Sequence, residues 1–123
     1  MTKTALALTR EEWQAYRPGA KVDKPQASER WERAWLVAEA AAETLRERFG
    51  ATRVVAFGSI AHRDWFTPWS DIDLAAWGIP PEAFYRAVAA VTGISPEFRV
   101  DLVASEDCRP AIRRAIEQEG VAL

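Results

Sequence analysis

The sequence contains 123 residues, with 16 Lys and Arg against 18 Asp and Glu, so its formal net charge at pH 7 is −2. This length suits one domain, and the lack of a basic excess disfavours a general nucleic-acid-binding protein. Hydrophobic residues make up 49% of the chain, which excludes wholesale disorder.

Cysteine and histidine content narrows the chemistry further. Cys108 is the only cysteine and His62 the only histidine. An internal disulfide is therefore excluded, Cys108 is expected to be inert, and a metal site would have to use carboxylates that hold a hard cation. No apolar run approaches the roughly 20 residues that span a bilayer, so we expect a cytoplasmic protein with no membrane partner.

The N-terminal part of the sequence divides into an appendage and a long helix. Residues 1–27 are predicted to form an appendage and linker that precede the domain, which is predicted to span residues 28–123. Ser28 is the predicted N-cap of a helix that runs to Phe49 and ends before a glycine. Apolar side chains recur every three or four positions along this helix, which predicts that one of its faces packs on a core.

Short apolar segments and helix signals alternate after the long helix. The predicted strands are Arg53–Phe57, Ile72–Trp77 and Phe98–Val103. One further helix is predicted to begin at Pro81 and end at Gly93, and another covers Pro110–Glu119. This order predicts an α/β (α+β) domain with a small mixed β-sheet flanked by helices.

Three aspartates lie at or within the predicted strands, two at the start of the second and one in the third. Asp71 and Asp73 are two positions apart, so in a strand their side chains point to the same face, about 7 Å apart. Asp101 lies in the middle of the third apolar strand, where an unpaired carboxylate is costly to bury. A lone strand aspartate is as often a salt-bridged or edge residue as a functional one. Acids on two neighbouring strands, however, can surround one or two Mg²⁺ ions.

A Gly-Ser step follows the first predicted strand. Gly58 lets the backbone approach a ligand closely, and the N–H groups of Gly58 and Ser59 can point at phosphate oxygens. Alone, such a step usually marks only a turn. Together with an acidic metal centre further along the chain, it is typical of phosphoryl or nucleotidyl transfer, in which catalysis is mainly positioning and charge neutralisation.

The combined pattern resembles the signature of a known family. Val54–Ser59 followed by Ser70–Ala75 is similar to the motif of the minimal nucleotidyltransferases of the DNA polymerase β superfamily, and the resemblance extends over Ala51–Leu123. It implies the polymerase β-like nucleotidyltransferase fold, ATP as substrate and Mg²⁺ in a two-metal site. The catalytic metal ligands that it implies are Asp71, Asp73 and Asp101. The nucleotide-binding residues that it implies, or that stand beside the motif, are Gly58, Ser59, His62, Arg63 and Ser70.

The resemblance also implies a partner. Small members of this family often pair with a HEPN-domain toxin, which implies that this chain is the antitoxin and moves AMP from ATP onto a hydroxyl, expected to be that of a tyrosine, of the toxin. Little chain follows the third strand, so we expect another chain to complete the acceptor site. The first alternative is a non-catalytic module that neutralises its partner by forming a complex. A transferase acting on a small molecule such as an aminoglycoside ranks third, and a homo-oligomer is compatible with the sequence.

Two stretches near the motif depart from the family pattern. Ala61-His62-Arg63 stands where many members have Ala-Arg-Gly, so either Arg63 acts from a shifted position or His62 replaces the family arginine. The aromatic loop Trp65–Trp69 can cover the sheet, contact a partner or stack on the adenine. A basic cluster on the last helix is expected to be a solvated face, with a partner or nucleotide contact as the alternative: Arg109, Arg113 and Arg114.

Overall fold

A computed structural model describes residues 24–123, so residues 1–23 of the appendage and linker predicted over residues 1–27 lie outside the described residues. Its elements are, in chain order, α2 (Lys24–Phe49), β1 (Arg53–Phe57), the 3₁₀-helices η3 (Gly58–Ala61) and η4 (Arg63–Trp65), β2 (Ile72–Trp77), α3 (Pro81–Thr92), β3 (Val100–Ala104), α4 (Pro110–Glu119) and β4 (Val121–Ala122).

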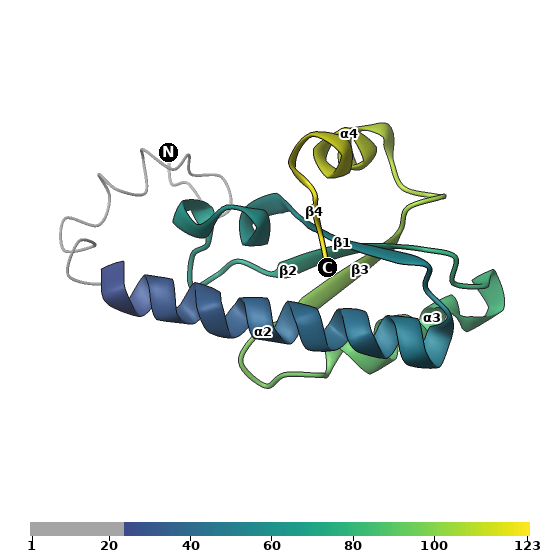
Figure 1. Ribbon diagram of the computed structural model, residues 1–123, viewed down its shortest axis with the longest axis horizontal. Helices are drawn as coiled ribbons and strands as arrows, with labels where there is room; N and C mark the ends of the chain where they lie inside the picture. The colour runs from purple at the N-terminus through teal and green to yellow at the C-terminus, as the bar shows by residue number, and fades with distance from the viewer. Residues whose placement is uncertain (1–23) are drawn as a thin grey trace, which may run out of the picture.

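The four strands form one mixed sheet in the order β3-β2-β1-β4. β1 pairs antiparallel with β2 and β4, whereas β2 and β3 run parallel and are connected through α3. α2 and α3 lie on one side of the sheet and α4 lies on the other (Figure 1). This arrangement confirms the predicted α+β class with a small mixed sheet flanked by helices.

Alternation of side chains along the strands divides the core in two. The larger cluster lies between the sheet and helices α2 and α3, and its largest fully buried side chains are Leu45, Ile60, Ile72, Leu74, Val54, Val91 and Val100. The smaller cluster lies under α4 and is built from Val55, Phe57, Ala75 and Ile116. Because alternate residues of a strand share a face, Asp73 belongs to the same side as Ala75, beneath α4.

The predicted start of α2 is wrong. The helix begins at Lys24, ahead of the predicted N-cap Ser28 and within the stretch predicted as linker. Pro25 is compatible with a helical first turn, because the backbone N–H that proline lacks would find no partner there. A proline in this part of the sequence was therefore compatible with a helix as well as with a linker.

Two strand predictions also need correction. β3 covers Val100–Ala104 rather than starting at Phe98, because the Ser95 hydroxyl accepts the backbone N–H groups of Glu97 and Phe98 and keeps them in a turn. β4 was not predicted, since a strand of two residues has no periodicity to detect.

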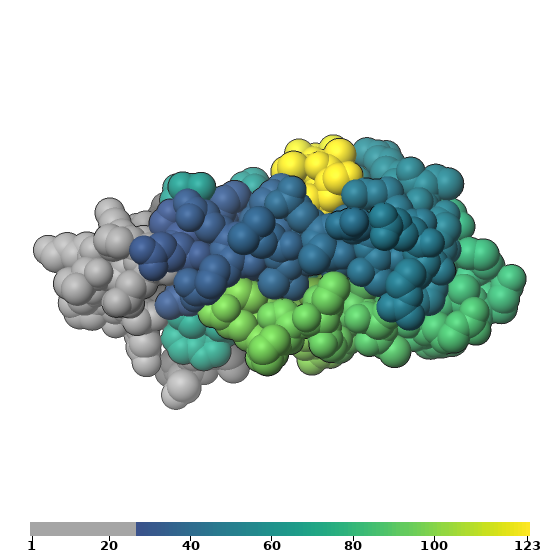
Figure 2. Space-filling view, turned by 60° about the horizontal axis from the view of Figure 1, so that its bottom comes forward, coloured from purple at the N-terminus to yellow at the C-terminus, as the bar shows by residue number. Residues whose placement is uncertain are grey.

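The C-terminal end of the chain is held against both α2 and the sheet. Figure 2 shows the C-terminal residues lying against α2, where Arg46 Nη1 donates to the Leu123 carbonyl over 3.0 Å. The N–H of Leu123 donates to the Val54 carbonyl over 3.0 Å. Arg33 of α2 pairs with Glu97 over 2.7 Å. Among residues 24–123, no helix combines the length and the apolar character that a membrane span requires.

Candidate active site

Two of the predicted catalytic aspartates lie side by side on neighbouring parallel strands. In the register of β2 and β3, Asp73 pairs with Asp101, and both lie on the side of the sheet that α4 covers. Asp71 stands just before β2. Asp101 is exposed, whereas Asp71 and Asp73 are half-buried. The structure thus brings the three acids to one end of the sheet, while their catalytic role stays a prediction.

Gly58 follows β1 and lies directly against Asp73. Phe57 is the cross-strand partner of Asp73, so the next residue passes over the carboxylate. Gly58 has a φ of 72°, and a Cβ added to it would lie 2.7 Å from Asp73 Oδ2. The backbone conformation and the lack of space both favour glycine here. The predicted phosphate-binding turn is therefore in contact with the acidic centre.

The acids repel one another. The pKa of Asp73 is raised from 3.8 to about 7, first by burial and then by the negative charges of Asp101 and Asp71. A divalent cation relieves such repulsion, and oxygen ligands are those that Mg²⁺ prefers. Within residues 24–123, however, no three acidic, histidine or cysteine side chains already gather around one point as a metal site. The chemistry of the donors fits Mg²⁺, although the carboxylates are not assembled around a common centre.

The raised pKa of Asp73 predicts how stability depends on pH in the absence of divalent ions. The carboxyl loses its proton near pH 4 in the unfolded chain and near pH 7 in the folded protein. Because the folded state binds more protons in this window, the free energy of unfolding falls as the pH rises from about 4 to about 7. Each pKa unit corresponds to about 1.4 kcal/mol, and screening of this partly exposed group reduces the total loss to about 2 kcal/mol.

Urea unfolding at pH 4 and pH 7.5 checks this expectation. From pH 4 to pH 7.5, the free energy of unfolding should fall by about 2 kcal/mol more in wild type than in the Asp73→Asn variant, which has no proton to release at this position. All carboxyl groups remote from Asp73 are common to both proteins, so their titration cancels in the comparison, and the difference reports Asp73 together with its coupling to Asp71 and Asp101. An identical loss in wild type and variant would show that Asp73 does not titrate abnormally.

The two predicted nucleotide-binding serines lie in structured turns. Ser59 is part of η3, and its carbonyl accepts the N–H of His62 over 3.0 Å. The Ser70 hydroxyl accepts the N–H of Thr67 over 2.9 Å and lies 3.0 Å from the Thr67 hydroxyl. Ser70 thereby closes the turn that leads the chain into the acidic segment. A contact between either hydroxyl and a nucleotide stays a prediction.

His62 points between the loop and the last helix. Its Nε2 atom is buried and lies 3.7 Å from Glu119 Oε1 at the end of α4, without a hydrogen-bond partner in the described part of the chain. The ring lies on Trp65, with 3.8 Å between the ring centroids. These contacts join the loop to α4, and the predicted contact of His62 with a nucleotide is not tested by them.

Arg63 reaches the other way, toward α2. Its guanidinium lies 4.6 Å from the ring centroid of Trp31, and its Nη1 atom donates to the Ser28 hydroxyl over 3.3 Å. Glu32 Oε1 is 3.7 Å from its Nη2 atom. In this position the guanidinium fastens η4 to the first part of α2. Its predicted role in binding phosphate would require it to exchange these contacts for the nucleotide.

The aromatic loop between the two motifs divides between core and surface. Phe66 is only 5% exposed and its ring centroid lies 6.0 Å from that of Phe98. Trp65 and Trp69 are 40% and 52% exposed. The interpretation that the loop covers the sheet therefore holds for Phe66, whereas partner contact and base stacking stay predictions for the two exposed indoles.

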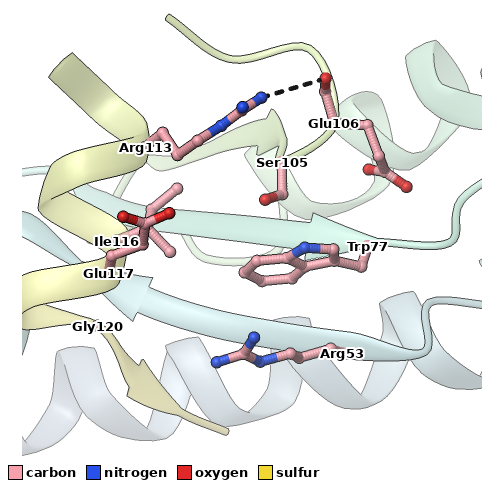
Figure 3. A pocket seen from close by; sticks show the side chains of 8 residues that line it. All are labelled: Arg53, Trp77, Ser105, Glu106, Arg113, Ile116, Glu117 and Gly120. Atoms are coloured by element: carbon pink, nitrogen blue, oxygen red, sulfur yellow. Dashed lines mark hydrogen bonds between the residues drawn. The ribbon is translucent and has the colours of Figure 1, made fainter. Parts of the chain in front are cut away.

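A hollow of about 520 Å³ opens at the other end of the same face (Figure 3), lined by Arg53, Trp77, Ser105, Glu106, Arg113, Ile116, Glu117 and Gly120. Sequence reasoning missed it because its lining comes from segments far apart in the chain. Several of its polar groups bind within the protein: Arg53 lies 4.5 Å from the centroid of the Trp77 ring, and Glu106 Oε2 accepts the N–H of Gly78 over 3.1 Å. Four strand residues, about 13 Å, separate it from Asp73. The hollow is therefore not part of the acidic site.

Comparison with known sequences places the acids and the Gly-Ser step within a domain of known type. A sequence profile described as the nucleotidyltransferase domain matches residues 38–123, a stretch that includes the Gly-Ser step and all three aspartates. A search of curated proteins found no match. Because the matched residues make up more than half of the chain, it belongs to the nucleotidyltransferase domain family, whose general reaction is nucleotidyl transfer.

Proposed function

We propose that this protein moves AMP from ATP onto a hydroxyl group, with Mg²⁺ held by Asp71, Asp73 and Asp101. The observation that carries the proposal is the pairing of Asp73 with Asp101 directly beside Gly58, which puts carboxylate oxygens against the backbone of the Gly-Ser turn. Bound Mg²⁺ would supply charge neutralisation between the carboxylates and the phosphates. The raised pKa of Asp73 supports this, because its causes, first the burial of the carboxyl and then the negative charges of Asp101 and Asp71, are ones that a bound cation would offset.

The groups of the chain itself divide the remaining work. The backbone N–H groups at Gly58 and Ser59 bind and orient phosphate oxygens. Positioning of this kind, together with charge neutralisation, accounts for most of the catalysis in such transfer reactions. Asp101, the exposed acid, accepts the proton of the attacking hydroxyl. The hydroxyl oxygen forms a bond to the α-phosphorus of ATP as the bond to the bridging oxygen breaks, and pyrophosphate leaves.

We further propose that the acceptor is a tyrosine of a HEPN-type toxin and that the protein acts as its antitoxin. The resemblance of the two motifs to minimal nucleotidyltransferases supports this assignment. The exposed indoles of Trp65 and Trp69 support it as well, since they offer a partner an apolar surface between the Gly-Ser and Asp-x-Asp motifs.

Label transfer tests both proposals. The full chain is incubated with ATP labelled at the α-phosphate, Mg²⁺ and the product of the adjacent gene, which this proposal expects to be a HEPN-type protein. Label should appear on the partner, should disappear when EDTA removes the metal, and should disappear when the acceptor tyrosine is replaced by phenylalanine. Absence of label on a folded partner would overturn the proposed acceptor.

Neutralisation by complex formation alone is the second candidate. It is favoured by the observation that the three carboxylates are not gathered around one point within the described residues. The double variant Asp71→Asn/Asp73→Asn separates the two functions in cells that express the toxin. Continued neutralisation by this variant supports complex formation, whereas loss of neutralisation with an intact complex supports catalysis.

A further inference from the structure

The phosphate-binding turn depends on outside contacts for its position. η3 is a 3₁₀-helix of only four residues, a length at which a helix has little stability of its own. Its first residue, Gly58, lies against Asp73, so any movement of η3 changes the distance between the phosphate-binding N–H groups and the acids. The contacts that fix η3 therefore bear directly on the proposed reaction.

One side chain of α2 supplies such a contact. The indole Nε1 of Trp31 donates to the carbonyl of Ile60, the third residue of η3, over 2.9 Å. The Ile60 side chain is fully buried in the core beneath, so η3 is held through both its backbone and its side chain. The same indole ring lies under the guanidinium of Arg63 from η4. Trp31 thus contacts both of the successive 3₁₀-helices, η3 and η4.

We propose that Trp31 is a positioning residue for the nucleotide: its indole N–H holds η3 so that the backbone at Gly58 and Ser59 presents its N–H groups to phosphate. This inference rests on the proposed function for the identity of the ligand. If the turn is in place in only a fraction of the molecules, the apparent affinity for phosphate is the intrinsic affinity multiplied by that fraction. Loss of the hydrogen bond should therefore weaken nucleotide binding and leave the chemical step nearly unchanged.

The variant Trp31→Phe removes the N–H and keeps an aromatic ring beneath Arg63. Trp35→Phe is the matched control, because Trp35 lies one helical turn further along α2 and stacks on Trp31 with 5.3 Å between the ring centroids. Both variants lose one indole from the same partly buried stack. A general loosening of that stack would affect them equally, whereas the hydrogen bond to Ile60 is lost only in Trp31→Phe.

Two measurements test whether Trp31 positions η3 for nucleotide binding, and the first needs no enzymatic activity. Hydrogen exchange of the His62 amide, which donates to the Ser59 carbonyl and closes η3, should be about fivefold faster in Trp31→Phe than in Trp35→Phe. In the label-transfer assay, the KM for ATP should rise about fivefold in Trp31→Phe, with kcat within about twofold of wild type.

The outcomes keep the inference apart from the proposed function. Equal exchange rates in the two variants would overturn the role of Trp31, whatever the activity. Faster exchange together with an unchanged KM would overturn its role in nucleotide binding. If wild type transfers no nucleotide to any acceptor, the proposed function fails, and titration of the variants with ATP and Mg²⁺, followed by tryptophan fluorescence, decides the inference: equal affinities overturn it.

Discussion

Replacement of Asp73 by asparagine is expected to reduce kcat/KM by at least about 1,000-fold and, in the absence of metal, to raise the melting temperature by about 5 °C. The loss of activity follows from the loss of a carboxylate that we propose to hold Mg²⁺. The gain in stability follows from the raised pKa of Asp73, because the carboxylate is ionised above pH 7 against burial and two other negative charges. Asparagine keeps the shape of the side chain and removes the charge.

The opposite signs of the two effects make this experiment specific. A variant that merely disturbs the fold loses activity and stability together. Label transfer and thermal unfolding at pH 7.5 measure the two quantities, and Asp107→Asn, at an exposed position in the turn after β3, is the matched control that should change neither. Activity within tenfold of wild type would show that Asp73 holds no essential metal. A lower melting temperature would show that its charge is not repelled.

The sequence predicted the fold well where periodicity was strong. Strands Arg53–Phe57 and Ile72–Trp77 and the helix from Pro110 to Glu119 have the predicted bounds, because apolar segments ended by glycine or opened by proline leave little choice. The errors fall where the signal is weak or carries two meanings. Ser28 resembles a helix cap yet lies inside α2, and β4 is defined by pairing with a distant strand rather than by its own two residues.

The candidate site could be predicted only in part, because some of its contacts depend on which segments lie side by side in the fold. Spacing alone placed Asp71 and Asp73 on one face, but the pairing of Asp73 with Asp101 depends on strand order, and a sequence does not reveal which strands are neighbours. The hydrogen bond from Trp31 to Ile60 joins residues far apart in the chain, so helical periodicity identified Trp31 only as part of an apolar face. His62 and Arg63 were assigned to nucleotide by their place after the motif, and the sequence did not show that His62 lies near Glu119 of α4 or that Arg63 donates to Ser28 of α2.

Replacement of Gly58 by alanine is expected to reduce kcat/KM by about 100-fold and to lower the free energy of unfolding by about 2 kcal/mol. Two costs combine. The φ of 72° disfavours any residue with a Cβ by about 1 kcal/mol, and the new methyl group would stand 2.7 Å from Asp73 Oδ2. Either the turn or the carboxylate must shift, and a displacement of about 1 Å at a reacting centre accounts for the loss of rate.

A second background separates these two costs. In a protein that carries Asp73→Ala, the nearest remaining contact of the added Cβ is with the Cβ position of residue 73 at 3.7 Å, which is ordinary van der Waals distance. The stability cost of Gly58→Ala should therefore fall to the backbone part, about 1 kcal/mol, in that background. Gly93→Ala, at a glycine whose Cβ would meet nothing within 4 Å, is the matched control and should cost little in either background. Equal costs of Gly58→Ala in both backgrounds, measured by urea unfolding, would show that the turn does not press on the carboxylate. That result would remove the contact by which the proposed phosphate-binding turn and the acids form one site.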